Sequence, residues 1–369
     1  MLNPGRPVKM TYTREDEFQN AYVRQGLHIN IKTAVRKDGK ILGSKNVLAW
    51  DGGAYTEYGV NIVKAAGWGC VGPYDIENIA TDSYCVYTNH PVGGPYRGFG
   101  MCEIHFGIEQ NIDMIAHEMG LDPLEMRKIN GIREGGKSAT GQTIDVAGYQ
   151  ECLERASQLM EMDKPSAPSG SPTKLRGKGI AGGWKAPSMP TDVASSVIIR
   201  MNEDGTFILL ASCHDIGQGS DTIMAQIAAE TLTVPVEKIS VRTGDTDYTP
   251  YEWQTVASRS TYCAGNATKL AAEDLRNKVL ELAQIKMGTW KNDLYLEGGY
   301  VCRKFYPDQK VPLAAFALGL TLPDQSGIGG PMIGVGSFVV PNNIAADKKT
   351  GLSPKPVAFW SMGVNGAEV

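Results

Sequence analysis

Residues 93–120 read GGPYRGFGMCEIHFGIEQNIDMIAHEMG, a glycine-rich loop that runs directly into a helical pattern. Beyond Gly100, apolar residues recur every three or four positions, at Ile104, Ile108, Ile112, Ile115 and Met119. This spacing places them on one face of an α-helix. Gly120 is the residue type that most often follows the last turn of a helix. The sequence therefore predicts a loop that opens an amphipathic helix.

Strand patterns precede this loop. Residues 26–35 alternate apolar and polar side chains, and the turn at residues 37–40, Lys-Asp-Gly-Lys, separates them from a second strand pattern at residues 41–50. The pair predicts a β-hairpin, and a shorter strand is expected at residues 7–12. On the other side of the helix, Asp122-Pro123 predicts the capped start of a short helix, and residues 148–161 predict another.

The clearest boundary is a proline- and serine-rich segment, residues 163–172. It predicts an exposed, mobile linker at residues 164–174 that a protease should cut first. Beyond it, residues 193–201 and 206–212 predict a second hairpin. A helix at about 220–232, a strand at 238–242 and a long helix at about 264–286 are expected to follow.

Strands and helices thus occur on both sides of the linker, which predicts an α+β fold of two mixed domains. The first domain is expected to span residues 1–163, and the second residues 175–369.

Composition narrows the class of protein. The chain has 369 residues, of which 42% are hydrophobic and 21% charged, and its net charge is −4. These values predict a globular protein and argue against nucleic acid or an anionic membrane as its main partner. Neither a membrane-spanning run nor a secretory signal pattern is apparent. The seven cysteines form no C-x-x-C pair, so we expect a reduced, cytoplasmic protein without its own iron–sulfur cluster.

Three loops each precede a predicted helix, at residues 93–100, 217–221 and 255–261. Each would place free backbone N–H groups and the positive end of a helix dipole at its tip. Taken singly, such a loop is more often a plain connection, and its serines can be ordinary helix caps. Taken together, the three loops suit a large polyanion bound mostly by backbone amides.

Side chains in these loops add further donors. Arg97 and Arg259 bring planar cationic groups, whereas Gln218, Ser258 and Ser260 bring neutral ones. We expect the three tips, near Arg97, Gln218 and Ser258, to face one cleft.

Other polar residues do not form a recognisable site. No P-loop pattern occurs, and the glycine-rich residues 327–334 lack the strand–turn–helix context of a dinucleotide fingerprint and are expected to be loop. Glu109, Asp113 and His117 form a polar stripe that is expected to be a solvated helix face. His214-Asp215 adjoins the second loop, but no nucleophile with a partner accompanies it.

The loops carry a resemblance to a known family. Pro95-Tyr96-Arg97-Gly98-Phe99-Gly100 resembles the arginine–glycine–phenylalanine–glycine loop of molybdenum hydroxylases, the family of xanthine dehydrogenases and aldehyde oxidases. Gly217-Gln218-Gly219 resembles their Gly-Gln-Gly loop. Ala257-Ser258-Arg259-Ser260-Thr261, followed by Gly265-Asn266-Ala267, resembles their third cofactor loop. Residues 5–9 and 14–16 look like the strand after their first cofactor loop, so the resemblance runs through the chain in family order.

The resemblance implies a molybdenum-dependent oxidoreductase. Its cofactor would be molybdenum on a molybdopterin bearing phosphate, in some relatives extended as the cytosine dinucleotide. Its reaction would be hydroxylation of a heterocycle, of purine or nicotinate type, or of an aldehyde, with water as the oxygen source. Electrons would leave through iron–sulfur clusters to FAD. Those groups would reside on an iron–sulfur subunit and a FAD subunit, with the remaining molybdopterin-binding segments as a further partner.

The resemblance also assigns roles to residues. Arg97 would be catalytic and would polarise the substrate or the oxygen ligands of the metal, and Phe99 would stack on a flat heterocyclic substrate. No protein side chain of this chain would ligate the metal. The cofactor would contact Tyr96, Arg97, Gly98, Ile216, Gly217, Gln218, Thr255, Ala257, Ser258, Arg259 and Ser260.

Departures from the family pattern limit what the chain is expected to do alone. The family's first cofactor loop and its catalytic glutamate are not identifiable, and Glu368 lacks the glycine context of that glutamate. Met101-Cys102-Glu103 stands where relatives commonly have a small residue, proline and glutamine. We therefore expect a chain that is incomplete at both ends and inactive in isolation. Two alternatives stay open: a reductive relative acting on an aromatic thioester, and an inactive cofactor-binding fragment.

Overall fold

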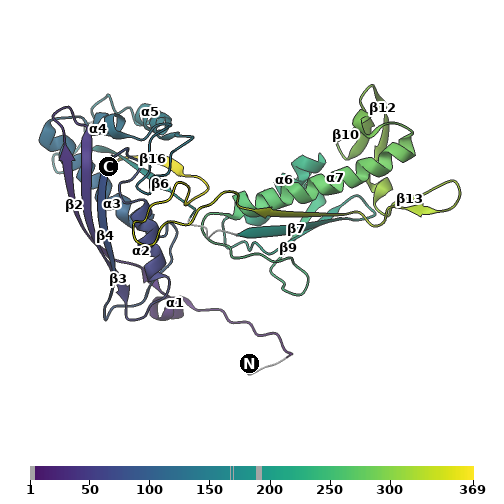
Figure 1. Ribbon diagram of the computed structural model, residues 1–369, viewed down its shortest axis with the longest axis horizontal. Coiled ribbons are helices and arrows are strands. Elements are labelled where there is room, and N and C mark those ends of the chain that lie inside the picture. Colours follow the sequence, from purple (N-terminus) through teal and green to yellow (C-terminus); the bar gives the residue numbers. More distant parts are fainter. Residues whose placement is uncertain (1–4, 167, 169, 188–192) are drawn as a thin grey trace. The chain divides into compact units, whose positions relative to one another are not determined.

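The computed structural model describes residues 5–166, 168, 170–187 and 193–369 (Figure 1). The chain divides into two compact units, Met1–Ala186 together with Ile344–Val369, and Pro187–Asn343. Each unit mixes strands and helices, which confirms the predicted α+β class. The division falls at Ala186, so residues 164–174, the predicted linker, lie inside the first unit.

A three-stranded sheet forms one side of the first unit, in the order β2–β3–β4. Strands β2 (Leu27–Val35) and β3 (Ile41–Gly53) form the predicted hairpin. Strand β4 (Asn78–Tyr87) pairs with β3 in parallel after a crossover through helix α2 (Gly59–Trp68). Leu48 and Trp50 of β3 point to the buried face.

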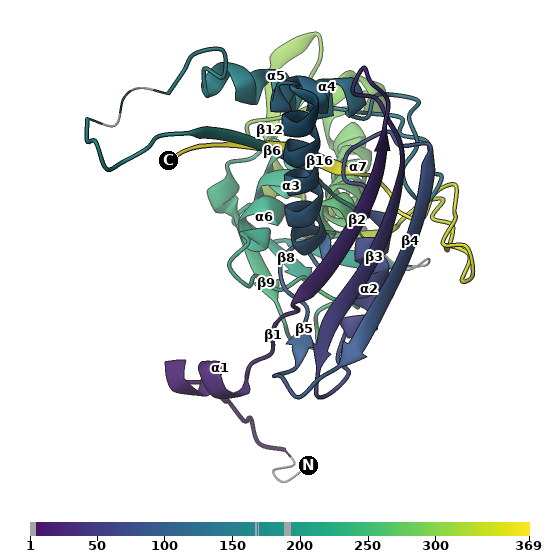
Figure 2. The ribbon, with the colours of Figure 1, turned by 90° about the vertical axis from the view of Figure 1, so that its left-hand side faces the viewer.

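Helix α3 (Met101–Met119) covers that face together with α2 (Figure 2). Ile104, Ile108 and Ile112 lie in the same core as the buried side chains of β3, so the predicted isoleucine stripe is confirmed. Gly120 adopts a left-handed conformation, and its N–H closes the end of the helix. The local pattern therefore placed both the helix and its buried face correctly.

The remaining early elements of the first unit are short. They are α1 (Arg14–Asn20), β1 (Val23–Arg24), which pairs in parallel with β5 (Gly93–Gly94), α4 (Pro123–Asn130) and α5 (Tyr149–Leu159). Asp122 caps α4 as predicted, accepting a hydrogen bond from the N–H of Leu124 at 2.8 Å. The strand expected at residues 7–12 is wrong, because this exposed segment pairs with no other described strand.

Strand β6 (Lys178–Lys185) explains where the first unit ends. It pairs antiparallel with β16 (Ser361–Glu368), and its Ile180 and Trp184 pack into the core beneath α3. On its other edge, the N–H of Gly182 donates to Glu109 Oε2 of α3 at 2.7 Å. The chain beyond the predicted linker is therefore fastened to the first unit as far as Ala186.

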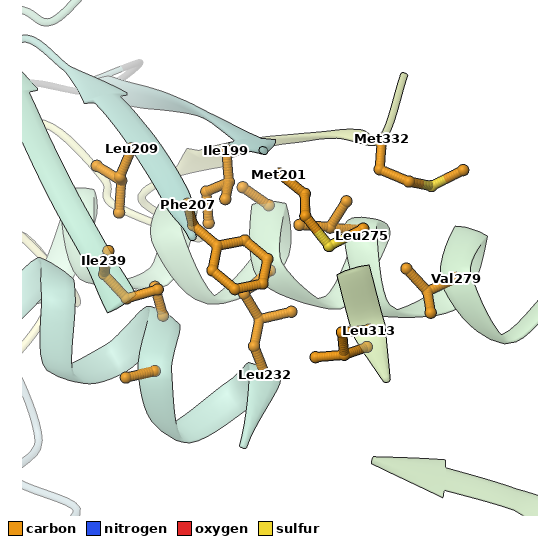
Figure 3. Close-up of a cluster of buried hydrophobic side chains, with 14 of the residues drawn as sticks. Ile199, Met201, Phe207, Leu209, Leu232, Ile239, Leu275, Val279, Leu313 and Met332 are labelled. Atoms are coloured by element: carbon orange, nitrogen blue, oxygen red, sulfur yellow. The ribbon is translucent and has the colours of Figure 1, made fainter. Parts of the chain in front are cut away.

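The second unit is built on a four-stranded sheet in the order β15–β7–β8–β9. Strands β7 (Ala194–Met201) and β8 (Phe207–Ala211) form the second predicted hairpin, and β9 (Ile239–Thr243) and β15 (Ile333–Val339) complete the sheet. Helices α6 (Ser220–Leu232) and α7 (Gly265–Met287), which continues from a π-helical turn η2 (Ser260–Ala264), pack on one face. Figure 3 shows Phe207, Leu209 and Ile199 of the sheet with Leu232 and Leu275 of the helices in this core.

The rest of the second unit consists of short elements. They are η1 (Val236–Lys238), η3 (Lys291–Asp293), β10 (Leu294–Glu297), β11 (Tyr300–Arg303), β12 (Tyr306–Pro312), η4 (Leu313–Phe316), β13 (Leu320–Thr321) and β14 (Gly327–Ile328). Strand β14 and the start of β15 fall within residues 327–334, which were expected to be loop.

Candidate functional site

The loop before α3 has an unusual backbone. Gly98, Phe99 and Gly100 all have positive φ angles, of 107°, 53° and 87°. A Cβ at Gly100 would lie 2.9 Å from the carbonyl oxygen of Ile62, so glycine is required there for space as well as conformation. Phe99 has no such freedom, and a left-handed non-glycine residue costs about 1–3 kcal/mol that the surroundings must offset.

The side chains of this loop face different surroundings. Tyr96 and Arg97 are exposed, whereas Phe99 is half-buried, with its ring centroid 6.4 Å from that of Tyr58. The main chain is fastened from outside the loop by Arg24, whose Nη2 donates to the carbonyl oxygen of Arg97 at 2.8 Å. The loop therefore presents the Arg97 side chain to solvent from a fixed backbone.

The second loop is organised by Asp215. Its Oδ1 accepts hydrogen bonds from the N–H groups of Gly217 and Gly219, at 2.8 and 3.4 Å, and these bonds lower the pKa of its carboxyl group. A carboxylate thus already occupies the nest of amides that was expected to be free for a ligand. The expectation that this loop binds a polyanion through open amides is therefore wrong for these two groups, because Asp215 lies within reach of its own loop.

Gln218 is also folded back onto the loop. Its Oε1 accepts from the N–H of Ile216 at 2.6 Å, and its Nε2 donates to the carbonyl oxygen of His214 at 2.8 Å. Ile216 is 76% exposed, and a Cβ at Gly217 would meet nothing within 4 Å. The surface that this loop offers is an apolar side chain beside open backbone, which suits the face of a flat ring better than a phosphate.

The third loop resembles the first in its backbone. Ala257 and Ser258 are consecutive non-glycine residues with φ angles of 59° and 55°. Thr255 Oγ1 accepts a hydrogen bond from the N–H of His214 at 2.9 Å, which joins the second and third loops. These two loops therefore lie side by side in the second unit. The loop of Arg97 belongs to the first unit, and its convergence with them stays a prediction.

Arg259 differs from its predicted role as a cationic donor at a loop tip. It is 1% exposed, forms an ion pair with Glu252, and donates from Nε to the carbonyl oxygen of Gln254 at 2.9 Å. Its guanidinium also lies over the ring of Trp253, and burial lowers its pKa. A side chain in this position shapes the loop from beneath, and contact of Arg259, Ser258 and Ser260 with a cofactor stays a prediction.

Sequence reasoning missed Arg24 and Glu252, which contact the first and third loops, and it noted Asp215 only as a neighbour of the second loop. Asp215 carried a usable signal, because an aspartate two residues before a glycine commonly accepts hydrogen bonds from the following turn. Arg24 carried none, since its partner Arg97 lies 73 residues away. Glu252, the partner of Arg259, is close in sequence, but nothing in the local pattern marks it as buried.

Among the described residues, no group of three or more His, Cys, Asp or Glu side chains is placed to hold a metal ion. In the same part of the chain, every helix is too short or too polar to cross a membrane.

Comparison with known proteins matches two family models to this chain. Both describe a molybdopterin cofactor-binding domain, one over residues 2–131 and the other over residues 152–369. The second model alone covers more than half of the chain, and all three loops lie within the two matched ranges.

Individual relatives agree with these models. A putative xanthine dehydrogenase molybdenum-binding subunit of Escherichia coli (strain K12) is 33% identical over 83% of this chain and 41% of its own length. An aldehyde oxidoreductase of Megalodesulfovibrio gigas is 32% identical over 73% of this chain and 30% of its own length. The chain thus spans less than half of the length of these relatives.

Solved structures show the same fold. The aldehyde oxidoreductase from Desulfovibrio gigas superposes with a TM-score of 0.76 at 25% identity, covering 97% of this chain and 36% of its own. Quinoline 2-oxidoreductase from Pseudomonas putida 86 superposes with a TM-score of 0.81 at 23% identity, covering 97% of this chain and 46% of its own.

Proposed function

The chain belongs to the molybdenum hydroxylase family, as a section of its molybdopterin-binding large subunit, and on this premise we propose the function of its loops. They bind molybdopterin within an oxidoreductase that hydroxylates a heterocycle of purine or nicotinate type, or an aldehyde, with water as the oxygen source. One observation carries the proposal: three of the seven left-handed non-glycine residues in the described part of the chain, Phe99, Ala257 and Ser258, lie in the loops that resemble the family's cofactor and substrate segments. Strained backbone of this kind is concentrated at ligand sites.

The surfaces of the loops fit such a cofactor. Gly217 has open space where a side chain would stand, and Ile216 is exposed beside it, so a flat pterin ring can lie against this loop. Main-chain groups at Ala257 and Ser258, with the side chains of Thr255 and Ser260, supply polar contacts from the third loop. Tyr96, Arg97 and Gly98 supply them from the first, Gln218 holds the second loop in shape, and Arg259 supports the third from beneath.

The residues around the substrate would act by charge and by stacking. When bound, the molybdenum cofactor supplies the redox chemistry of the hydroxylation. Arg97 is exposed on a fixed backbone, and its guanidinium stabilises negative charge that develops on a substrate oxygen or nitrogen. Phe99 is half-buried against Tyr58 and packs against the face of a ring or the carbon chain of an aldehyde.

The partners and the location are part of the same proposal. Iron–sulfur clusters and FAD reside on partner subunits, and further molybdopterin-binding segments complete the site. The proposed location is the cytoplasm, which is supported by seven cysteines that are all free thiols. The cofactor carries a cytosine nucleotide or lacks it, and nucleotide analysis of the purified assembly separates the two forms.

The test begins with the isolated chain. We expect it to purify with little molybdenum, because the family's first cofactor loop is not identifiable in this chain. We also expect no turnover of aldehyde, purine or nicotinate with an artificial electron acceptor. A catalytic base must lie within hydrogen-bond reach of the proton it removes, and the family's catalytic glutamate is not identifiable here. Robust turnover by the chain alone would contradict this expectation, and Glu368 would then be the first candidate for the base.

The second arm uses the assembly that contains this chain and its partner subunits. We expect stoichiometric molybdenum, and a loss of roughly 100- to 1000-fold in kcat for Arg97→Met, the range measured for removing one electrostatic donor at other active sites. Arg36→Met is the matched control, because Arg36 pairs with Asp38 within its own hairpin and, among the described contacts, with no residue of the three loops. An assembly that folds without molybdenum would make the chain an inactive cofactor-binding fragment, and reduction of an aromatic thioester would identify the reductive relative.

A further inference from the structure

Arg24 makes three contacts with the segment that carries Arg97. Its Nη2 donates to the carbonyl oxygen of Arg97 at 2.8 Å, and its Nη1 donates to Glu103 Oε1 at 2.9 Å. The guanidinium also lies over the ring of Tyr96, 5.1 Å from the ring centroid. One side chain therefore contacts the loop before Arg97, the main chain at Arg97 and the first turn of α3 behind it.

Strand pairing places Arg24 beside the start of the loop. Strand β1, which contains Arg24, pairs in parallel with β5, and Arg24 lies opposite Gly94 in the register. A planar guanidinium can donate to a carbonyl and a carboxylate at once, whereas a lysine ammonium cannot reproduce that fork. The strand that leads into the loop pairs with the main chain of Arg24, and the helix that leaves the loop is bound by its guanidinium.

The loop needs such a tie because its own hydrogen bonds are few. The N–H of Phe99 donates to Tyr96 at 2.9 Å and that of Met101 to Gly98 at 3.2 Å, across a backbone with three successive positive φ angles. Among the described residues, the other donor to the carbonyl oxygen of Arg97 is the thiol of Cys102, at 3.8 Å. Glu103, whose side chain is 11% exposed, pairs through Oε1 with Arg24 alone among the described contacts.

We propose that Arg24 is a positioning residue for the reaction: it holds the main chain at Arg97 so that the Arg97 guanidinium is directed into the site. This role rests on the proposed function for its catalytic consequence, but the structural part stands on the contacts of this chain alone. Arg24 does not act on the substrate itself. The proposal extends the site to a residue outside the three loops.

Hydrogen–deuterium exchange on the full chain tests the structural part without any cofactor. In Arg24→Ala we expect amides of residues 96–104 to exchange at least about tenfold faster, whereas residues 110–119 of α3 keep their protection. Arg24→Lys should give an intermediate rate, and Arg36→Ala, which removes an exposed arginine from a distant turn, should leave both segments unchanged. Unaltered exchange at residues 96–104, or a uniform increase throughout the first unit, would overturn the positioning role.

Steady-state kinetics on the molybdenum-loaded assembly tests the catalytic part. We expect Arg24→Ala to lower kcat roughly 100-fold, the size of effect that misplacing a reacting group by about 1 Å produces, with molybdenum content unchanged and Arg24→Lys partly active. In an Arg97→Met background, Arg24→Ala should lower kcat no further, because it acts through Arg97.

The two experiments distinguish a failure of the proposed function from a failure of the positioning proposal. If Arg97→Met leaves kcat unchanged, the proposed function of Arg97 fails, while the exchange result still decides whether Arg24 holds the loop. If Arg97→Met is impaired and Arg24→Ala lowers kcat by the same factor in both backgrounds, Arg24 acts independently of Arg97 and the positioning proposal is wrong.

Discussion

Replacing Glu109 by glutamine should destabilise the first unit by about 3–5 kcal/mol, the cost of breaking a buried ion pair by removing one partner. Glu109 accepts three hydrogen bonds, from α4, from β6 and from the loop between α2 and β4. Tyr74 Oη donates at 2.5 Å, Arg127 Nε at 2.8 Å and the N–H of Gly182 at 2.7 Å. The carboxylate therefore joins α3 to α4 and β6.

The size of this loss in stability follows from the burial of Arg127, the ion-pair partner of Glu109. The side chain of Arg127 is fully buried, and its second carboxylate, Asp113, is 52% exposed. Burial by itself would lower the pKa of Arg127, but the charge of Glu109, together with Tyr74 and Asp113, raises it. Without the Glu109 carboxylate, the buried Arg127 cation would keep two backbone carbonyl acceptors, and Asp113, its remaining charged partner among the described contacts, is screened by solvent. Glutamine can accept at one oxygen where the carboxylate accepts at two.

Urea unfolding followed by tryptophan fluorescence measures the effect. Asp113→Asn is the matched control, and it should cost at most about 1 kcal/mol because its carboxylate is screened by solvent. The double variant Glu109→Gln/Arg127→Met removes both charges and should recover part of the loss. A free energy of unfolding for Glu109→Gln within about 1 kcal/mol of the parent chain, at the same m-value, would refute the buried network.

Three further predictions follow from single contacts. Burial lowers the pKa of His105 to about 4 from 6.5, so the unfolded chain binds the proton more readily between these values. Stability should then fall as pH drops from 6.5 to 4, by up to about 1.4 kcal/mol per pH unit, and His105→Gln should flatten that urea-unfolding profile. Gly100→Ala should cost more in urea unfolding than Gly219→Ala: both positions have positive φ, but only at Gly100 would the new Cβ meet a backbone oxygen. Asp215→Ala should speed hydrogen exchange at residues 216–221 and leave residues 260–268 unchanged, since it frees amides of the second loop only.

The sequence by itself determined the elements whose signals are local. The isoleucine stripe of α3, the Asp38-Gly39 turn of the first hairpin and the Asp122 cap of α4 each depend on residues within a few positions of one another. Such patterns act through the backbone geometry of one helix or one turn, so they can be recognised without knowing the rest of the fold. The order of the three loops was likewise sufficient to indicate the family.

Only the tertiary structure decided which polar groups are paired and buried. Glu109 was expected on a solvated face, yet it lies in the core because β6, more than 70 residues later, closes over it. Arg259 was expected at a loop tip, and Glu252 draws it inward. The strand pairing of β6 with β16 likewise placed the boundary between the units at Ala186. The sequence pattern around a charged side chain does not show whether that side chain is solvated or buried in an ion pair. The free energy difference between these two states depends on partners that only folding brings within reach.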